Sequence, residues 1–133
     1  MQSTETELQS RLAGRPLVVV VVDDDPAVCG SLKFSLELEG FVVRAYGSAG
    51  ELLSAADLGG CDCFVIDQRM PGMSGMELIG QLRSQKVLTP AILLISQPSP
   101  ALTARAATAD IPIVEKPLFG NVLVDRIRDA CRR

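Results

Sequence analysis

The sequence contains no histidine among its 133 residues. This absence excludes nucleophiles activated by histidine, and it excludes zinc sites that use imidazole ligands. Cysteine is scarce: four are present, at positions 29, 61, 63 and 131, and no two form a CxxC pair. Because Cys61 and Cys63 stand at the start of an apolar run, we expect buried structural thiols rather than a metal or redox site. Any chemistry therefore relies on carboxylates, hydroxyls and amines.

The sequence also lacks a long apolar run and a cluster of basic residues. Its apolar fraction is 47%, but the runs 17–22 and 91–95 are far shorter than the roughly 20 residues of a membrane helix. The first sixteen residues mix charges and contain no apolar stretch like that of a secretory signal. A net charge of −3 without a dense Lys/Arg cluster argues against direct nucleic-acid binding. These absences predict a soluble, cytoplasmic protein.

Short β-branched apolar runs alternate with longer amphipathic stretches, which is typical of a parallel sheet covered by helices. The predicted strands are LVVVVV (17–22), FVVRAY (41–46), CFVIDQ (63–68), AILLIS (91–96) and IPIV (111–114). The first and fourth are almost continuously apolar, which favours central strands covered on both faces. Pro112 cannot donate to a ladder, so the last strand belongs at an edge. The length suits one α/β domain over 17–133, with 1–16 as a tail or short helix.

Helix starts are marked by their capping residues. Asp25 precedes Pro26, a favoured first helical residue, and apolar residues then recur every fourth position. The segments 48–51 and 74–77 both read as capping boxes of the type Ser-x-x-Glu. Ser99 followed by proline predicts a short fourth helix that ends near residue 110. The last predicted helix follows Pro117 and carries on one face Val122, Leu123, Ile127, Ala130 and Cys131.

Polar residues stand where the predicted strands end. Asp23 and Asp24 follow the first strand, Asp67 ends the third, Ser96 ends the fourth and Lys116 follows the fifth. Each has an ordinary interpretation as a turn, capping or surface residue. Because ligands of parallel α/β sheets bind beyond the carboxyl ends of the strands, four such ends converging on one rim favour a functional site.

The residue types at this rim point to phosphoryl transfer. Asp23, Asp24 and Asp67 cannot all stay ionised close together without a counter-charge. Mg²⁺ is the natural counter-ion, since it takes oxygen ligands and leaves positions for water and phosphate. A carboxylate beside such an ion can attack phosphorus and form an acyl phosphate. Lys116 and Ser96 would then hold the phosphoryl oxygens.

From Leu17 to Ala130 the sequence resembles the receiver domain of bacterial two-component response regulators. The resemblance rests on VVDDDP, on VIDQRMPGMSG and on EKP, and the segment RMPGMSG is most similar to receivers of the nitrogen-fixation regulator type. It implies a flavodoxin-like, doubly wound fold: a five-stranded parallel sheet of order 2-1-3-4-5 flanked by five helices.

The resemblance also implies a role for each residue of the acidic site. Asp67 would be the phosphoacceptor, and Asp24 would be a direct Mg²⁺ ligand. Asp23 would act mostly through water, and the backbone carbonyl of Arg69 would supply a further ligand.

On the other side of the acceptor, Lys116 would sense the phosphate, with a cis bond to Pro117, and Ser96 would be the hydroxyl that moves toward it.

Three features depart from the family pattern. Gln97 stands where a small residue is usual, and Ile113 replaces the aromatic switch residue. The span from Ser96 to Lys116 is also shorter by about two residues. These departures alter a face on which many receivers dimerise.

The expected function is that of a single-domain response regulator that accepts a phosphoryl group from a sensor histidine kinase onto Asp67. The start at Met1 and the end of the chain after the last helix favour this interpretation. Beyond self-phosphorylation and autodephosphorylation we expect no enzyme activity. A homodimer is one possible output, and the sequence does not identify the downstream target.

Two alternatives stay open: the receiver part of a longer DNA-binding transcription regulator, and a phosphate-independent binding module with an atypical switch face. A magnesium phosphatase is disfavoured, because Arg69 stands where those enzymes carry a second acid.

Overall fold

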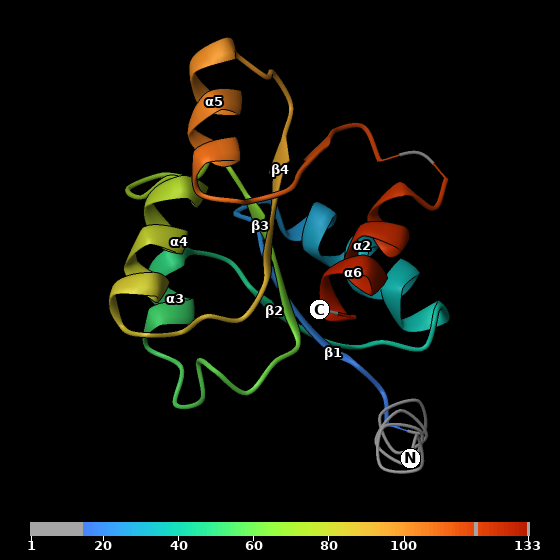
Figure 1. Ribbon diagram of the computed structural model, residues 1–133. Helices are drawn as coiled ribbons and strands as arrows, with labels where there is room; N and C mark the ends of the chain where they lie inside the picture. Colours follow the sequence, from blue (N-terminus) through green and yellow to red (C-terminus); the bar gives the residue numbers. More distant parts are fainter. Residues whose placement is uncertain (1–14, 119, 133) are drawn as a thin grey trace, which may run out of the picture.

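Five strands alternate with five helices along residues 15–118 and 120–132, the part of the chain that the computed structural model describes (Figure 1). The elements are β1 (Val18–Val22), α2 (Pro26–Leu38), β2 (Val42–Tyr46), α3 (Ala49–Leu53), β3 (Cys63–Asp67), α4 (Gly75–Ser84), β4 (Ala91–Ile95), α5 (Pro100–Thr108), β5 (Ile113–Glu115) and α6 (Val122–Cys131). The short helix considered for the first sixteen residues lies almost wholly outside the described residues.

The strands form one parallel sheet in the order β2-β1-β3-β4-β5. This order confirms the predicted doubly wound fold, in which β1 and β4 are interior strands. Pro112 directly precedes the edge strand β5, and its carbonyl oxygen accepts a hydrogen bond from the backbone N–H of Leu93 at 2.9 Å. The proline therefore contributes an acceptor to the sheet at a place where no further strand requires its missing donor.

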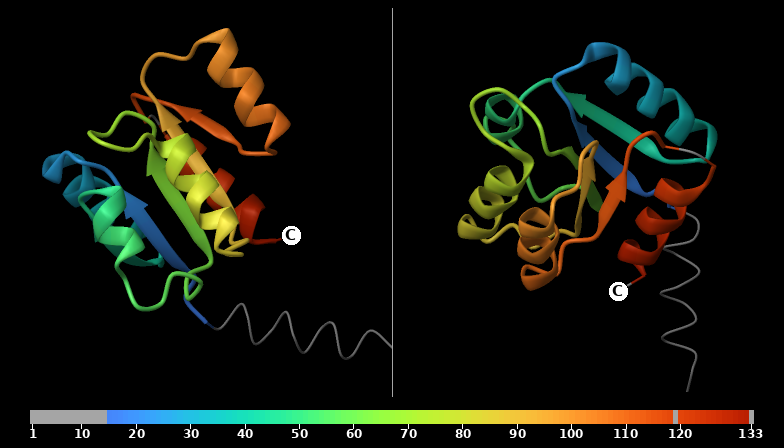
Figure 2. Two further views of the ribbon diagram at one scale, coloured as in Figure 1. Left: turned by 90° about the vertical axis from the view of Figure 1, so that its left-hand side faces the viewer. Right: turned by 90° about the horizontal axis from the view of Figure 1, so that it is seen from above.

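Helices cover both faces of the sheet, with α3, α4 and α5 on one side and α2 and α6 on the other (Figures 1 and 2). Alternate residues of each strand point to opposite faces, so β1 contributes Val20 and Val22 to one apolar core and Val19 and Val21 to the other. Every residue of β3 and β4 is buried. None of the helices in the described ranges combines the length and the apolar character needed to cross a membrane.

The predicted helix caps form, with one difference. Asp25 accepts a hydrogen bond from the N–H of Ala27, and Ser74 makes a complete capping box at the start of α4. At α3 the hydroxyl of Ser48 accepts from the N–H of Glu51, but the Glu51 carboxylate accepts from Gly47 instead of Ser48. The reciprocal bond is thus displaced by one residue.

The buried face of α6 differs from the prediction at Val122, which is 53% exposed. Val122 is the first residue of the helix, and it shares a face with Arg126 and Asp129, four and seven positions later, which are both exposed. Val124 is buried in its place.

Candidate functional site

The carboxyl ends of the strands bring the predicted site residues to one rim of the sheet. Asp23 follows β1, Asp67 is the last residue of β3, and Lys116 follows β5. The backbone N–H of Lys116 donates to the carbonyl of Ile95 at 2.7 Å, which fixes the lysine backbone to the end of β4. The parallel sheet therefore places groups from three strands side by side.

Lys116 connects two buried carboxylates. Its Nζ lies 2.7 Å from Oδ1 of Asp67 and 3.2 Å from Oδ2 of Asp23. Asp23 is 2% exposed and Asp67 is 5% exposed, whereas Asp24 is exposed. One ligand oxygen from each of these three aspartates lies within 4.8 Å of the others. The structure thus brings the three carboxylates and the lysine together at one rim.

The three consecutive aspartates have different surroundings. Both oxygens of Asp23 have partners, since Oδ1 accepts from the backbone N–H of Asp25 at 2.9 Å and Oδ2 faces Lys116. Asp25 accepts from the N–H of Ala27 at 2.9 Å and caps α2. Asp24 is exposed and accepts no hydrogen bond from the described residues. Its carboxylate is therefore the one of the three that can take a new ligand at the least cost in broken contacts.

Burial is the main cause that raises the pKa of Asp67 above its ordinary value. The nearby charges of Asp23 and Asp24 raise it further, while the hydrogen bond from Lys116 acts in the opposite direction. For Lys116, burial alone lowers the pKa, but hydrogen bonds and charges of Asp67 and Asp23 outweigh it, so the pKa is raised. Lys116 stays a cation at neutral pH.

The charge balance of the cluster fits a divalent cation. When all three carboxylates are ionised, three negative charges face the single positive charge of Lys116, which leaves two negative charges. All acceptors are hard oxygens, and Asp24 opens to solvent, so waters and a phosphoryl group have access. The residues present therefore suit Mg²⁺.

Ser96 and Arg69 lie on the same rim, one residue after β4 and two residues after β3. Both are exposed, and neither side chain hydrogen-bonds to Asp67 within the described part of the chain. Their roles toward phosphate and metal stay predictions. The peptide bond between Lys116 and Pro117 is cis, as the resemblance implied.

Sequence reasoning missed how Gly75 contributes to the site. A Cβ atom at this position would lie 2.6 Å from the carbonyl oxygen of Asp67, so only glycine lets the start of α4 approach the end of β3. The Gly75 N–H donates to the carbonyl of Gln68 at 3.0 Å, and the Gln68 side chain accepts from the N–H of Met76 at 2.9 Å. These contacts fix the loop that follows the candidate acceptor. The capping box revealed the helix start, but not its approach to the strand.

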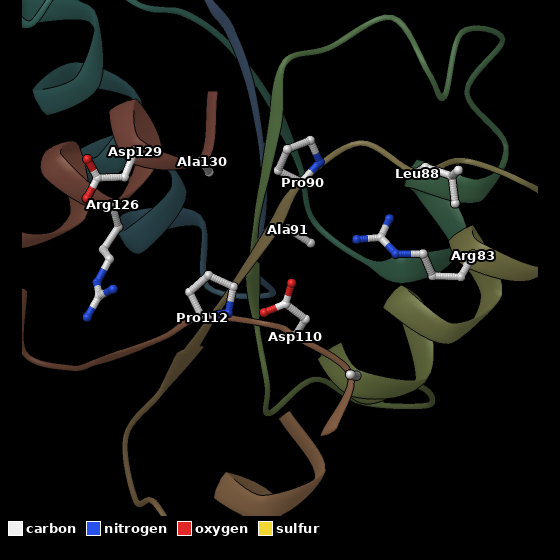
Figure 3. A pocket seen from close by; sticks show the side chains of 10 residues that line it. Arg83, Leu88, Pro90, Ala91, Asp110, Pro112, Arg126, Asp129 and Ala130 are labelled. Atoms are coloured by element: carbon white, nitrogen blue, oxygen red, sulfur yellow. The ribbon is translucent and has the colours of Figure 1, made fainter. Parts of the chain in front are cut away.

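A separate cavity of about 320 Å³ lies at the amino ends of the strands, away from the acidic rim, beside the starts of β4 and β5 (Figure 3). Arg83 and Asp110 line it on one side and Arg126 on another. One Arg83 nitrogen donates to the carbonyls of Val87 and Thr89 at 2.8 and 2.9 Å, which gives this arginine a structural task. No residue of the acidic cluster lines this cavity.

A family model described as the response regulator receiver domain matches residues 19–128. The chain belongs to this family. The match includes the acidic cluster and Lys116, and it confirms the resemblance carried by the motifs around Asp24, Asp67 and Lys116.

Curated relatives of this receiver are transcription regulators. TrcR of Mycobacterium tuberculosis is 32% identical over 125 residues, which cover 92% of this chain and 48% of TrcR. FixJ of Rhizobium meliloti is 34% identical over 113 residues, covering 84% of this chain and 55% of FixJ. The chain thus spans about half the length of the curated relatives it matches.

Solved receiver structures share the fold. The crystal structure of FixJ-N is similar with a TM-score of 0.79 at 32% identity, covering 90% of this chain and 96% of that one. The receiver domain of Francisella response regulator 1452 gives a TM-score of 0.80 at 26% identity, covering 88% and 98%.

Proposed function

We propose that this receiver accepts a phosphoryl group from a sensor histidine kinase onto Asp67, in a Mg²⁺-dependent cytoplasmic phosphorelay. One observation carries the proposal. Oδ1 of the buried Asp67 lies 2.7 Å from Nζ of Lys116, and Asp67 belongs to a group of three carboxylates whose oxygens lie close enough together to bind one metal ion. Receiver domains are signalling domains, so the expected chemistry is transfer to and loss from the protein itself.

In the proposed transfer, an oxygen of Asp67 attacks the phosphorus of the donor phosphohistidine. The new O–P bond forms as the N–P bond breaks, and the imidazole nitrogen keeps the electron pair and takes up a proton. Lys116, held 2.7 Å from Oδ1 before transfer, pairs with a phosphoryl oxygen afterwards. The group brings about −1.5 to −2 charges to the rim, and this change of charge is the signal.

Asp24, Asp23 and Asp67 would hold Mg²⁺, with the carbonyl of Arg69 as a further ligand. When bound, the ion supplies positive charge that neutralises the oxygens of the transferring phosphoryl group. Asp23 keeps its hydrogen bond from the Asp25 N–H and its contact with Lys116, and so it positions the site. Its engaged oxygens support the role through water that the resemblance implied.

The test is incubation with acetyl phosphate and Mg²⁺, followed by intact-mass measurement. We expect one phosphoryl adduct in the native protein and none after chelation with EDTA. Asp67→Asn should show no adduct, while the matched control Asp57→Asn, at an exposed loop position, should behave like the native protein. An adduct that persists in Asp67→Asn, or no adduct in the native protein, would overturn the acceptor assignment.

The output has two candidate forms. One is a stand-alone receiver that signals through a partner or through dimerisation. The other is the receiver part of a longer DNA-binding transcription regulator, which is favoured by the half-length match to TrcR and FixJ. The open reading frame around the codons for Met1 and Arg133 in the source DNA separates the two, and light scattering with beryllofluoride reports phosphorylation-linked dimerisation.

A further inference from the structure

Two cysteines far apart in the sequence meet on the α6 face of the sheet. Cys63 is the first residue of β3 and is 0% exposed, whereas Cys131 is the last residue of α6 and is half-buried. Cys63 belongs to the apolar core that α6 shares with the sheet, and Cys131 packs against this core. The Cys131 thiol donates a hydrogen bond to the carbonyl oxygen of Asp62 at 3.6 Å, and Asp62 directly precedes Cys63 in the chain. The Cys63 thiol donates to the carbonyl oxygen of Phe64 at 3.5 Å. The structure thus places two reduced thiols near each other on the same face of the sheet.

The surroundings of the four thiols distinguish one of them as a nucleophile. Interaction with the Cys63 thiol lowers the pKa of Cys131, with burial and the charge of Asp62 acting against it. The same interaction and burial raise the pKa of Cys63. Burial also raises the pKa of Cys29, and it raises the pKa of Cys61 to about 12. Oxidation by peroxide requires solvent access as well as thiolate character. Cys131 is half-buried at the end of α6, whereas Cys63 is 0% exposed, so Cys131 is the thiol of this pair that peroxide can reach.

We propose that Cys131 and Cys63 form a dithiol that hydrogen peroxide converts into a reversible disulfide between the end of α6 and the start of β3. The Cys131 thiolate attacks one peroxide oxygen and the O–O bond breaks, which gives a sulfenic acid and hydroxide. The sulfur of Cys63 then attacks the sulfur of Cys131, the S–O bond breaks, and the departing hydroxide takes the proton of Cys63. In sum, two thiols and one peroxide yield one disulfide and two waters, and a small dithiol reverses the reaction.

This inference departs from the sequence-based expectation of purely structural thiols. That expectation rested on Cys61 and Cys63, which are neighbours in the sequence. The reactive partner is Cys131, which only the packing of α6 against the sheet brings to Cys63.

The experiment treats the full chain with graded hydrogen peroxide and measures intact mass and remaining thiols under denaturing conditions. We expect the loss of two hydrogen atoms and of two of the four reactive thiols, with a peptide map that joins residues 63 and 131. Dithiothreitol should restore both thiols.

Cys131→Ser at its half-buried position, and separately Cys63→Ala, should each abolish the disulfide, whereas Cys29→Ser should form it like the native protein. Circular dichroism checks that each variant is folded. If Cys63→Ala does not fold, Cys131→Ser alone tests whether the disulfide requires Cys131. A disulfide that involves Cys29 or Cys61 would overturn the proposal. So would oxidation of Cys131 to a sulfinic acid while Cys63 stays reduced, or no oxidation of either.

Discussion

Gly75 allows a sharp test of how α4 is packed beneath the candidate acceptor. An added Cβ would lie 2.6 Å from the carbonyl oxygen of Asp67, 2.7 Å from Cδ1 of Leu93 and 3.0 Å from Cα of Gln68. Two of these three atoms belong to the backbone around the end of β3, so rotation of a side chain cannot relieve the contacts. Gly75→Ala must therefore displace the helix start, the acceptor strand, or both.

The expected cost follows from two opposing terms. Inserting a methyl group into a packed interior destabilises by about 1–3 kcal/mol. Alanine in place of glycine in a helix gains up to about 1 kcal/mol, and less in the first turn. We therefore expect Gly75→Ala to lower the free energy of unfolding by about 1–2 kcal/mol and the Tm by roughly 3–8 °C. The acceptor also moves, so phosphorylation by acetyl phosphate should slow.

Gly80 in the same helix is the matched control, because it is exposed and an added Cβ would meet nothing within 4 Å. Gly80→Ala should raise the free energy of unfolding by about 0.5–1 kcal/mol and leave phosphorylation unchanged. Urea titration measures both variants. If the two substitutions change stability in the same direction and to a similar extent, the close approach of α4 to Asp67 is refuted.

Three further predictions concern the charged residues of the rim. Asp24→Ala should abolish Mg²⁺-dependent phosphorylation, whereas Asp25→Ala should cost about 1 kcal/mol in urea titration and keep the chemistry; equal loss of phosphorylation would contradict the division of the aspartates. The pKa of Asp67 is raised by folding, so the folded state binds more protons, and metal-free stability falls as pH rises from the ordinary value of 3.8 through the higher folded value. Asp67→Asn should remove this decrease in stability and should be more stable than the native protein at pH 7. Thermal unfolding measured across pH tests this, and an equal decrease in both proteins would contradict it. Lys116→Met leaves Asp23 and Asp67 without their cation and should cost about 2–3 kcal/mol at pH 7, less than a fully buried pair because Lys116 is 22% exposed; added Mg²⁺ should restore part of the loss in urea titration.

The sheet was predictable because its strands are nearly continuous β-branched runs bounded by polar residues. Its order came from the family resemblance, and Pro112 independently indicated the edge. The capping residues Asp25 and Ser74 marked helix starts through local chemistry that needs no tertiary contact. Val122 was misplaced because an apolar residue in the first turn of a helix can point to solvent, and the pattern alone does not fix where the helix begins.

The gathering of the candidate site residues at one rim was predictable, but the contacts between them were not. Strand ends brought together Asp23, Asp67 and Lys116 by topology alone. Which oxygen of Asp23 faces the lysine, and how closely Gly75 approaches the acceptor strand, depend on packing between segments distant in the chain. The proximity of Cys63 and Cys131 also depends on such packing, and no pattern within a single segment predicts it.

β3 separates the two reactive sites that we propose. Cys63 and Asp67 are its first and last residues, about 13 Å apart along a strand in which every residue is buried. Close-packed interiors have low compressibility and transmit strain, so a disulfide at the start of β3 is coupled to the acceptor at its end. A second route runs through α6, which begins at Val122, six residues after Lys116, and ends at Cys131. Oxidation of the two thiols would therefore change phosphorylation through the position of Asp67, of Lys116, or of both.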